Sequence, residues 1–167
     1  MHDLDELMEE HSGYLVKIAY LYVKNWSTAE DIVQDVFITF YQKQAQFRQE
    51  ASLKTYLTTM TANRSKDYLR SWKRKKDVVF ETIFAKSDSV EQSFIQQEQL
   101  QELEKHLFDL PLKYREPLIL YYYNEWPISD IAAFLNLNEN TVKTHLRRAK
   151  QQLKAYFDSN EQEVWEG

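Results

Sequence analysis

The sequence contains no cysteine, and its 167 residues include only two glycines and three prolines. Without cysteine the chain has no disulfide scaffold, thiolate metal site, cysteine nucleophile or iron–sulfur cluster. Glycine-rich phosphate loops and β architectures with tight turns need residues that tolerate positive φ, so both are excluded as well. Because small secreted domains usually depend on disulfides, the absence of cysteine also favours the cytoplasm.

Long apolar runs are missing too. The longest, residues 117–123, is far shorter than the roughly 18 apolar residues that a membrane span requires. The N-terminal segment MHDLDELMEEHSGYL is acidic and lacks the apolar core of a signal peptide. With 43% hydrophobic and 28% charged residues the chain can bury a core, and we expect a cytoplasmic protein without membrane insertion.

Positive charge is concentrated in two segments of a chain whose net charge is −5. Residues 47–76 hold nine Lys and Arg against two Asp and Glu, and residues 140–157 hold five against none. Neutralisation of phosphates is local, so an acidic chain can still bind DNA through such segments. The alternative is that both segments are ordinary basic helix faces in contact with water.

Apolar residues recur at helical spacing along most of the chain and strand-like alternation is absent, which predicts an all-α fold. Residues 28–41 form one helix whose apolar stripe consists of Ile32, Val33, Val36, Phe37, Phe40 and Tyr41. We expect Ser27 or Thr28 to cap this helix. Its opposite face carries Asp31, Gln34 and Asp35.

The pattern divides the chain into two small helical domains. An earlier helix around residues 14–22 and a long helix from Leu53 to about Lys76 complete the first domain, residues 1–76. Residues 77–97 lose clean periodicity and are expected to form a linker. The second domain covers residues 98–157, and an acidic tail covers residues 158–167.

Aromatic residues are expected mainly in the two cores. In the second domain a helix is predicted from Tyr114 to Tyr123 with Pro117 in its first turn, and Trp126 and the tyrosines at 121–123 are expected to pack internally. In the first domain Tyr56 and Tyr68 are assigned to the core. Trp72 is left open between packing and stacking on a nucleic-acid base.

Residues 127–153, PISDIAAFLNLNENTVKTHLRRAKQQL, have the spacing of a helix–turn–helix. The first helix is expected to begin with a Ser129 cap and to end near Asn136, and the second to begin with an Asn138 cap. The apolar residues of the second helix fall within about 60° of arc; they are Val142, Leu146, Ala149 and Leu153.

The opposite face of this second helix presents amides, hydroxyls and basic groups, which suit base edges and phosphates in a major groove. Its residues are Asn140, Thr141, Lys143, Thr144, Arg147, Arg148 and Gln151. The alternative is an ordinary α-hairpin with a solvent-exposed basic face.

With these motifs in place, the chain resembles the extracytoplasmic-function sigma factors, the smallest sigma subunits of bacterial RNA polymerase. NWSTAEDIVQDVFITFYQK, followed by FRQEASLKTYLTTMTANRSKDYLRSWKRKK, is similar to region two of that family. LPLKYREPLILYYYNEWPISDIAAFLNLNENTVKTHLRRAKQQL is similar to region four. The two blocks occur in the family's order within residues 5–157, and the middle domain of larger sigma factors is not expected.

The resemblance implies three binding surfaces. Region two would bind core RNA polymerase through Asp31, Gln34 and Asp35, for which a solvated helix face is the alternative. Its long basic helix and the preceding loop would hold single-stranded DNA of the −10 promoter element, with the residues Phe47, Arg48, Ser52, Asn63, Lys66, Asp67, Arg70, Trp72, Lys73 and Arg74. Region four would read the −35 element as duplex with the helix face described above.

The resemblance also implies an anti-sigma factor as a further partner, and no cofactor or metal. His145 stands where the family often has a cation, which leaves the promoter sequence open. Two other readings remain: a stand-alone helix–turn–helix regulator, and a sigma-like interaction adaptor that does not open promoters. An enzyme is not expected, because the four histidines are scattered and no phosphate loop or nucleophile elbow is present.

Overall fold

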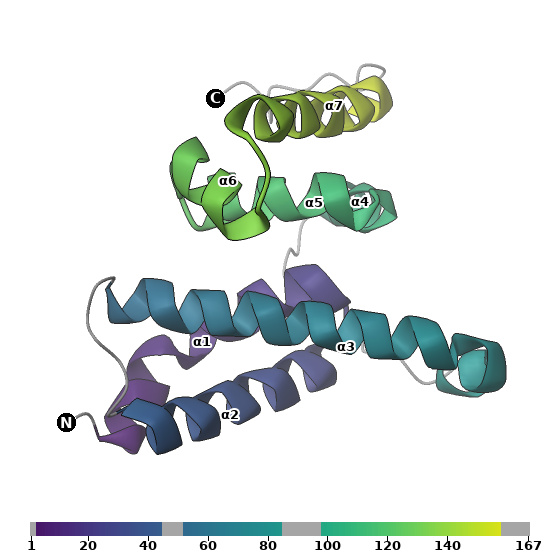
Figure 1. Cartoon of the computed structure of the whole chain (residues 1–167). Helices are drawn as coiled ribbons and strands as arrows, with labels where there is room; N and C mark the ends of the chain where they lie inside the picture. The colour runs from purple at the N-terminus through teal and green to yellow at the C-terminus, as the bar shows by residue number, and fades with distance from the viewer. Residues whose placement is uncertain (1–2, 45–51, 85–97, 158–167) are drawn as a thin grey trace. The chain divides into compact units, whose positions relative to one another are not determined.

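The computed structural model describes residues 3–44, 52–84 and 98–157, so the predictions for Phe47 and Arg48 lie outside the described residues. Every regular element in these ranges is helical, which confirms the all-α prediction. The chain forms two compact units, Met1–Phe94 and Ile95–Gly167 (Figure 1). Within the described ranges, none of the helices combines the length and apolar character needed to cross a membrane.

The N-terminal unit is built from three helices: α1 (Leu4–Val23), α2 (Trp26–Lys43) and α3 (Leu53–Phe84). Each packs against the other two (Figure 1). The predicted stripe of α2 supplies much of the core, with its Ile and Val residues, Phe37 and Phe40 all buried. Tyr41 is the exception, because it lies at the edge of the stripe and is 47% exposed.

The turn between α1 and α2 differs from the prediction in its capping residue. Asn25, not Ser27 or Thr28, is the N-cap of α2, and its Oδ1 accepts a hydrogen bond from the Thr28 backbone N–H at 2.8 Å. Helix α2 starts before the predicted position because Lys24 adopts a left-handed conformation (φ 60°), which ends α1 at Val23. Trp26 then stacks on Tyr20 with ring centroids 4.0 Å apart, which anchors the first turn of α2.

Helix α3 continues to Phe84, eight residues beyond the expected end at Lys76, so part of the segment expected as a linker is helical. No Gly or Pro interrupts residues 53–84, and nothing in the local sequence therefore stops the helix. Its buried face is narrow: Leu57 is buried, but Leu53 and Met60 are only half-buried. The other buried residues are small, namely Thr58, Thr61, Ala62 and Ser65.

The C-terminal unit contains α4 (Glu98–Asp109), α5 (Leu112–Leu118), a π-helix η3 (Ile119–Tyr123), α6 (Ile128–Leu135) and α7 (Glu139–Phe157). One apolar cluster joins them, with Leu110, Leu120, Ile131, Val142 and Leu153 among its buried members. Arg115 is buried as well, and its guanidinium donates to the backbone oxygens of Phe108 (3.3 Å) and Leu110 (3.2 Å). These bonds tie the end of α4 to α5.

The helix predicted from Tyr114 to Tyr123 is interrupted by a change of geometry. It begins at Leu112, so Pro117 lies in the second turn, and Ile119–Tyr123 then form a π-helix closed by a hydrogen bond from Asn124 N–H to the Ile119 oxygen (3.1 Å). Tyr121 and Tyr122 are 37% and 43% exposed, so the expectation that they pack internally is wrong. The wide turn buries Ile119 and Leu120 and leaves these two tyrosines outward.

The Asn25 cap provides a test of this local geometry. Asn25→Ala should lower the free energy of unfolding by about 1 kcal/mol, because a backbone N–H at the start of α2 loses its acceptor. Asn25→Asp should retain most of the stability, since a carboxylate can accept the same hydrogen bond. Ser27→Ala should change it by less than about 0.5 kcal/mol. Urea unfolding followed by far-UV circular dichroism measures all three, and a larger loss for Ser27→Ala than for Asn25→Ala would contradict the assignment.

Candidate functional site

Helices α6 and α7 are joined by a short turn with defined capping. Helix α6 begins at Ile128 after Pro127, so the predicted Ser129 cap is wrong: the backbone of Pro127 (φ −65°, ψ 154°) already leads into the helix, and Ser129 lies in its first turn. The helix ends at Leu135, and Asn136, with a φ of 59°, is the C-cap that reverses the chain. Asn138 caps α7 as predicted, with its Oδ1 accepting from the Thr141 N–H at 2.8 Å.

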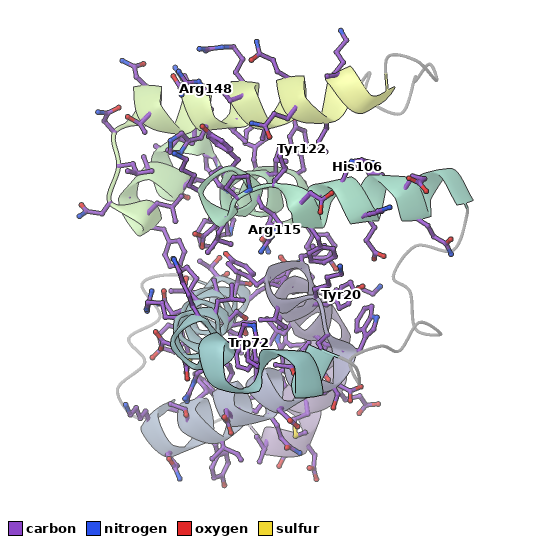
Figure 2. All side chains as sticks on the ribbon, turned by 90° about the vertical axis from the view of Figure 1, so that its right-hand side faces the viewer. Tyr20, Trp72, His106, Arg115, Tyr122 and Arg148 are labelled. Carbon is purple, nitrogen blue, oxygen red and sulfur yellow. The ribbon has the colours of Figure 1, made fainter. Side chains whose placement is uncertain are left out.

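One face of α7 is buried and the opposite face is exposed. Val142, Leu146, Ala149 and Leu153 are each no more than 7% exposed and join the core cluster of the unit. On the other side Asn140, Lys143, Arg147 and Arg148 are exposed, and Thr141 and Thr144 are half-buried. Figure 2 shows Arg148 on the outer side of α7. The helix has one acidic residue, Glu139, at its start. This surface can therefore attract phosphates and donate hydrogen bonds to base edges.

His145 lies between the two faces of α7 and points toward α5. Its ring meets the Tyr114 ring edge-on with centroids 5.4 Å apart, and its Nδ1 is buried without a hydrogen-bond partner among the described residues. Burial lowers the pKa of His145, and the nearby charges of Lys113 and Arg148 lower it further. The neutral imidazole is favoured, so His145 does not replace a cation on the exposed face.

The exposed side of α3 carries several of the residues predicted to hold single-stranded DNA. Asn63, Asp67 and Arg70 are exposed and Lys66 is half-buried. The Arg70 guanidinium donates to Asp67 Oδ1, which orients both side chains on the helix surface. Asn63 has both a donor and an acceptor to offer to the edge of a base.

The remaining predicted residues of this surface lie at the two ends of the basic segment. Ser52 is exposed and caps α3, its Oγ accepting from the Thr55 N–H at 3.1 Å. Trp72 is half-buried (labelled in Figure 2) and Lys73 is exposed. Arg74 belongs to α3, but its side chain lies outside the described residues. Of the aromatic residues assigned to the core, Tyr56 packs edge-on against Phe40 at 5.7 Å, and Tyr68 is half-buried.

The outer face of α2 is acidic and partly apolar. Asp31, Gln34 and Asp35 are exposed opposite the buried stripe. Ile38 (48% exposed) and Tyr41 continue the same face toward the end of the helix. The sequence pattern placed Tyr41 in the buried stripe and gave Ile38 no role. The signal for Ile38 was its i, i+3 and i, i+7 spacing from Asp35 and Asp31. Carboxylates beside exposed apolar groups suit a basic protein surface and repel DNA.

No group of three or more His, Cys, Asp or Glu side chains within residues 3–44, 52–73 and 101–155 is arranged to hold a metal ion. The arrangement of the described polar side chains is one of exposed helix faces. Such faces are accessible to a macromolecular partner.

Both units match families of known proteins. Residues 7–75 match the family described as Sigma-70 region 2, and residues 100–153 match the family described as Sigma-70, region 4. Together the two matches cover well over half of the chain.

Among curated proteins, the chain is 27% identical over 156 residues to the ECF RNA polymerase sigma factor SigM of Bacillus subtilis, covering 93% of this chain and 95% of that protein. It is 29% identical over 140 residues to the RNA polymerase sigma factor SigV of the same organism, covering 84% and 82%. Among solved structures, the sigma factor RpoE of Bartonella quintana, crystallised with the anti-sigma factor NepR, matches with a TM-score of 0.70 and 24% identity, covering 93% of this chain and 99% of that one. The last similarity shows the fold.

The lowered pKa of His145 predicts a pH dependence of stability. In the unfolded chain the imidazole has its ordinary pKa of about 6.5, so the unfolded state binds the proton more readily than the folded state. The free energy of unfolding should therefore fall as the pH drops from 6.5 through the lower folded pKa, and His145→Gln should remove this contribution. NMR titration of the imidazole and urea unfolding at about pH 7.5 and about pH 5 measure both effects. A His145 pKa at or above 6.5 would contradict the packing described here.

Proposed function

Because the chain belongs to the sigma-70 family and is a sigma factor of the extracytoplasmic-function type, we propose that it binds core RNA polymerase in the cytoplasm and directs it to a set of promoters. In this proposal residues 1–76 act as region two and residues 98–157 as region four. The chain itself is not an enzyme, and the polymerase supplies all the chemistry of RNA synthesis.

The observation that carries the proposal is the exposed face of α7. Helix α7 packs on the core of its unit and presents polar and basic side chains outward; the packed residues are Val142, Leu146, Ala149 and Leu153. Helix α6 and the turn at Asn136 precede it, as in a helix–turn–helix that inserts its second helix into a major groove. We assign −35 recognition to this face, with the residues Asn140, Thr141, Lys143, Thr144, Arg147 and Arg148.

The two polar surfaces of the N-terminal unit have opposite charge, which suits two different partners. We assign the acidic face of α2 to core polymerase, through Asp31, Gln34 and Asp35. The basic side of α3 is assigned to the −10 element as single-stranded DNA, because cations there can hold the backbone while Asn63 reads a base edge. The matches to region 2 and region 4, in this order along the chain, support a protein that binds both core polymerase and promoter DNA.

The alternatives explain less of the chain. A stand-alone helix–turn–helix regulator accounts for residues 100–153 but not for the region 2 match at residues 7–75. An adaptor without promoter-opening activity gives no role to the basic side of α3. The RpoE structure is that of a complex with an anti-sigma factor. A second solved structure, CnrH in complex with the cytosolic domain of CnrY, matches with a TM-score of 0.66 and 18% identity, covering 95% of this chain and 89% of that one. We propose that this chain, too, has an anti-sigma partner.

Transcription in vitro tests the function directly. Core polymerase with and without the full chain is presented with a pool of genomic promoter fragments, and the transcripts are sequenced. A subset of promoters should be transcribed only when the chain is present, with start sites that share −35 and −10 sequences. Absence of any chain-dependent transcript would contradict the proposed function and favour the adaptor.

The α2 assignment predicts that Asp35→Arg weakens binding to core polymerase by tenfold or more, equivalent to about 1.4 kcal/mol, because an attractive charge becomes repulsive. The fold should be retained, since a charge reversal on an exposed helix face costs less than about 0.5 kcal/mol. The matched control is Glu9→Arg, an exposed reversal on α1. Fluorescence anisotropy with labelled full chain measures the affinity, and equal affinities of the two variants would remove Asp35 from the interface.

The α7 assignment predicts different behaviour at the two ends of the helix. Thr144→Ala or Arg148→Ala should cost roughly 1–3 kcal/mol on the cognate −35 sequence and much less on others, because a lost base contact affects only the base that it read. Lys154→Ala, at the far end, should weaken binding to all sequences about equally. A library of −35 substitutions bound by each variant separates the two cases. Uniform losses for Thr144→Ala and Arg148→Ala would show that α7 holds phosphates without reading bases.

A further inference from the structure

The π-helix places an exposed aromatic pair beside α7. The ammonium of Lys150, on α7, lies over the Tyr122 ring at 5.1 Å from its centroid. Tyr121 meets Tyr122 edge-on with ring centroids 4.9 Å apart. Figure 2 shows Tyr122 directly below α7, on a different side of that helix from Arg148. Neither tyrosine belongs to the surfaces assigned above, and both remain well exposed.

The local backbone explains how Tyr122 comes to face outward beside α7. In the π-helix the chain bonds from Asn124 N–H to the Ile119 oxygen, a wider turn than in an α-helix. With Ile119 and Leu120 buried as anchors, the following two residues are presented outward together. The edge-on contact with Tyr121 restricts the Tyr122 ring further. The Tyr122 ring is therefore presented outward, beside the cation that lies over it.

Lys150 belongs to a row of cations along one side of α7. Lys143, Arg147, Lys150 and Lys154 fall within about 60° of arc when each residue advances by 100°. We call these four residues the basic flank. It borders the face assigned to base reading and shares Lys143 and Arg147 with it.

We propose that Tyr122 holds Lys150 in position to contact a backbone phosphate of duplex DNA beside the −35 element. The inference rests on the proposed function of α7. Lys150 keeps its N–H donors available for a phosphate, because the ring contacts the ammonium without accepting its hydrogen bonds in the way a carboxylate would. A lysine already ordered on a ring loses less side-chain entropy on binding than a free one. Tyr122 is therefore a positioning residue and Lys150 the contacting residue.

The observations favour DNA over a protein partner for this surface. The basic flank is continuous with the reading face and carries only positive charge, which matches a phosphate backbone. The exposed apolar and acidic face of α2 is the opposite case, where the charge disfavours DNA. A phosphate contact also carries no sequence information, so its loss should affect all duplexes alike.

The test uses the full chain and two labelled duplexes, one chain-dependent promoter fragment and the same fragment with a scrambled −35 element. Binding is measured by anisotropy over a series of salt concentrations. The variants are Lys150→Ala, Tyr122→Leu, Tyr122→Phe and the double variant Tyr122→Leu with Lys150→Ala. Lys105→Ala, an exposed lysine on α4 of the same unit, is the control for loss of one charge. Far-UV circular dichroism verifies that each variant is folded.

Lys150→Ala should weaken binding to both duplexes and reduce the salt slope by about 0.9, as expected for one phosphate contact. Tyr122→Leu should weaken binding by about twofold to fivefold with the slope retained, the range of an exposed cation–π contact, and Tyr122→Phe should bind like the wild type. In the Lys150→Ala background, Tyr122→Leu should have no further effect. Lys105→Ala should leave the slope unchanged.

Three results would overturn the proposal: an unchanged slope for Lys150→Ala, an equal loss for Tyr122→Phe and Tyr122→Leu, or a Tyr122→Leu effect that persists without Lys150. Failure of the proposed function gives a different result. A wild-type chain that binds both duplexes equally would contradict −35 reading by α7, while the variants would still report the phosphate contact. A wild-type chain that binds neither duplex would overturn both.

Discussion

Burial of one apolar stripe on each helix is the constraint on which the rest of this structure depends. In α7, Val142, Leu146, Ala149 and Leu153 face the core cluster, so the 3.6-residue period turns the polar residues outward. In α2, the buried stripe that includes Val36 and Phe37 does the same for the acidic face. The candidate binding surfaces are thus the reverse sides of the packing surfaces, and a substitution on one side should leave the other in place.

The charge on each outward face then separates the partners. The face of α2 has exposed carboxylates beside Ile38, which suit a basic protein surface. The exposed sides of α3 and α7 are rich in Lys and Arg, which suit phosphates. Because screening limits these fields to about a Debye length, faces of opposite sign can coexist on one small chain with a net charge of −5.

The aromatic and titratable residues next to α7 refine this surface. His145 is turned toward Tyr114 and favoured in its neutral form, so the positive charge of the helix comes from Lys and Arg alone. Tyr122 lies under Lys150 at the other side of the helix. The π-helix after Pro117 makes this possible by presenting Tyr121 and Tyr122 outward over a buried Ile119 and Leu120.

The sequence by itself determined the helical class, the order of the elements, the stripes of α2 and α7 and the Asn138 cap, because periodicity and capping depend on residues within a few positions of one another. Only the tertiary structure decided which borderline residues are buried. Three tyrosines are apolar enough for a core but lie outside it: Tyr41, Tyr121 and Tyr122. His145 is polar but packs inward. In each case burial depends on whether a helix distant in the sequence packs against that residue. The cap at Asn25 is local, since Asn is a preferred N-cap residue and its Oδ1 accepts from the Thr28 N–H. The stacking of Trp26 on Tyr20, which joins α1 to α2, is a contact between helices that the local pattern does not predict.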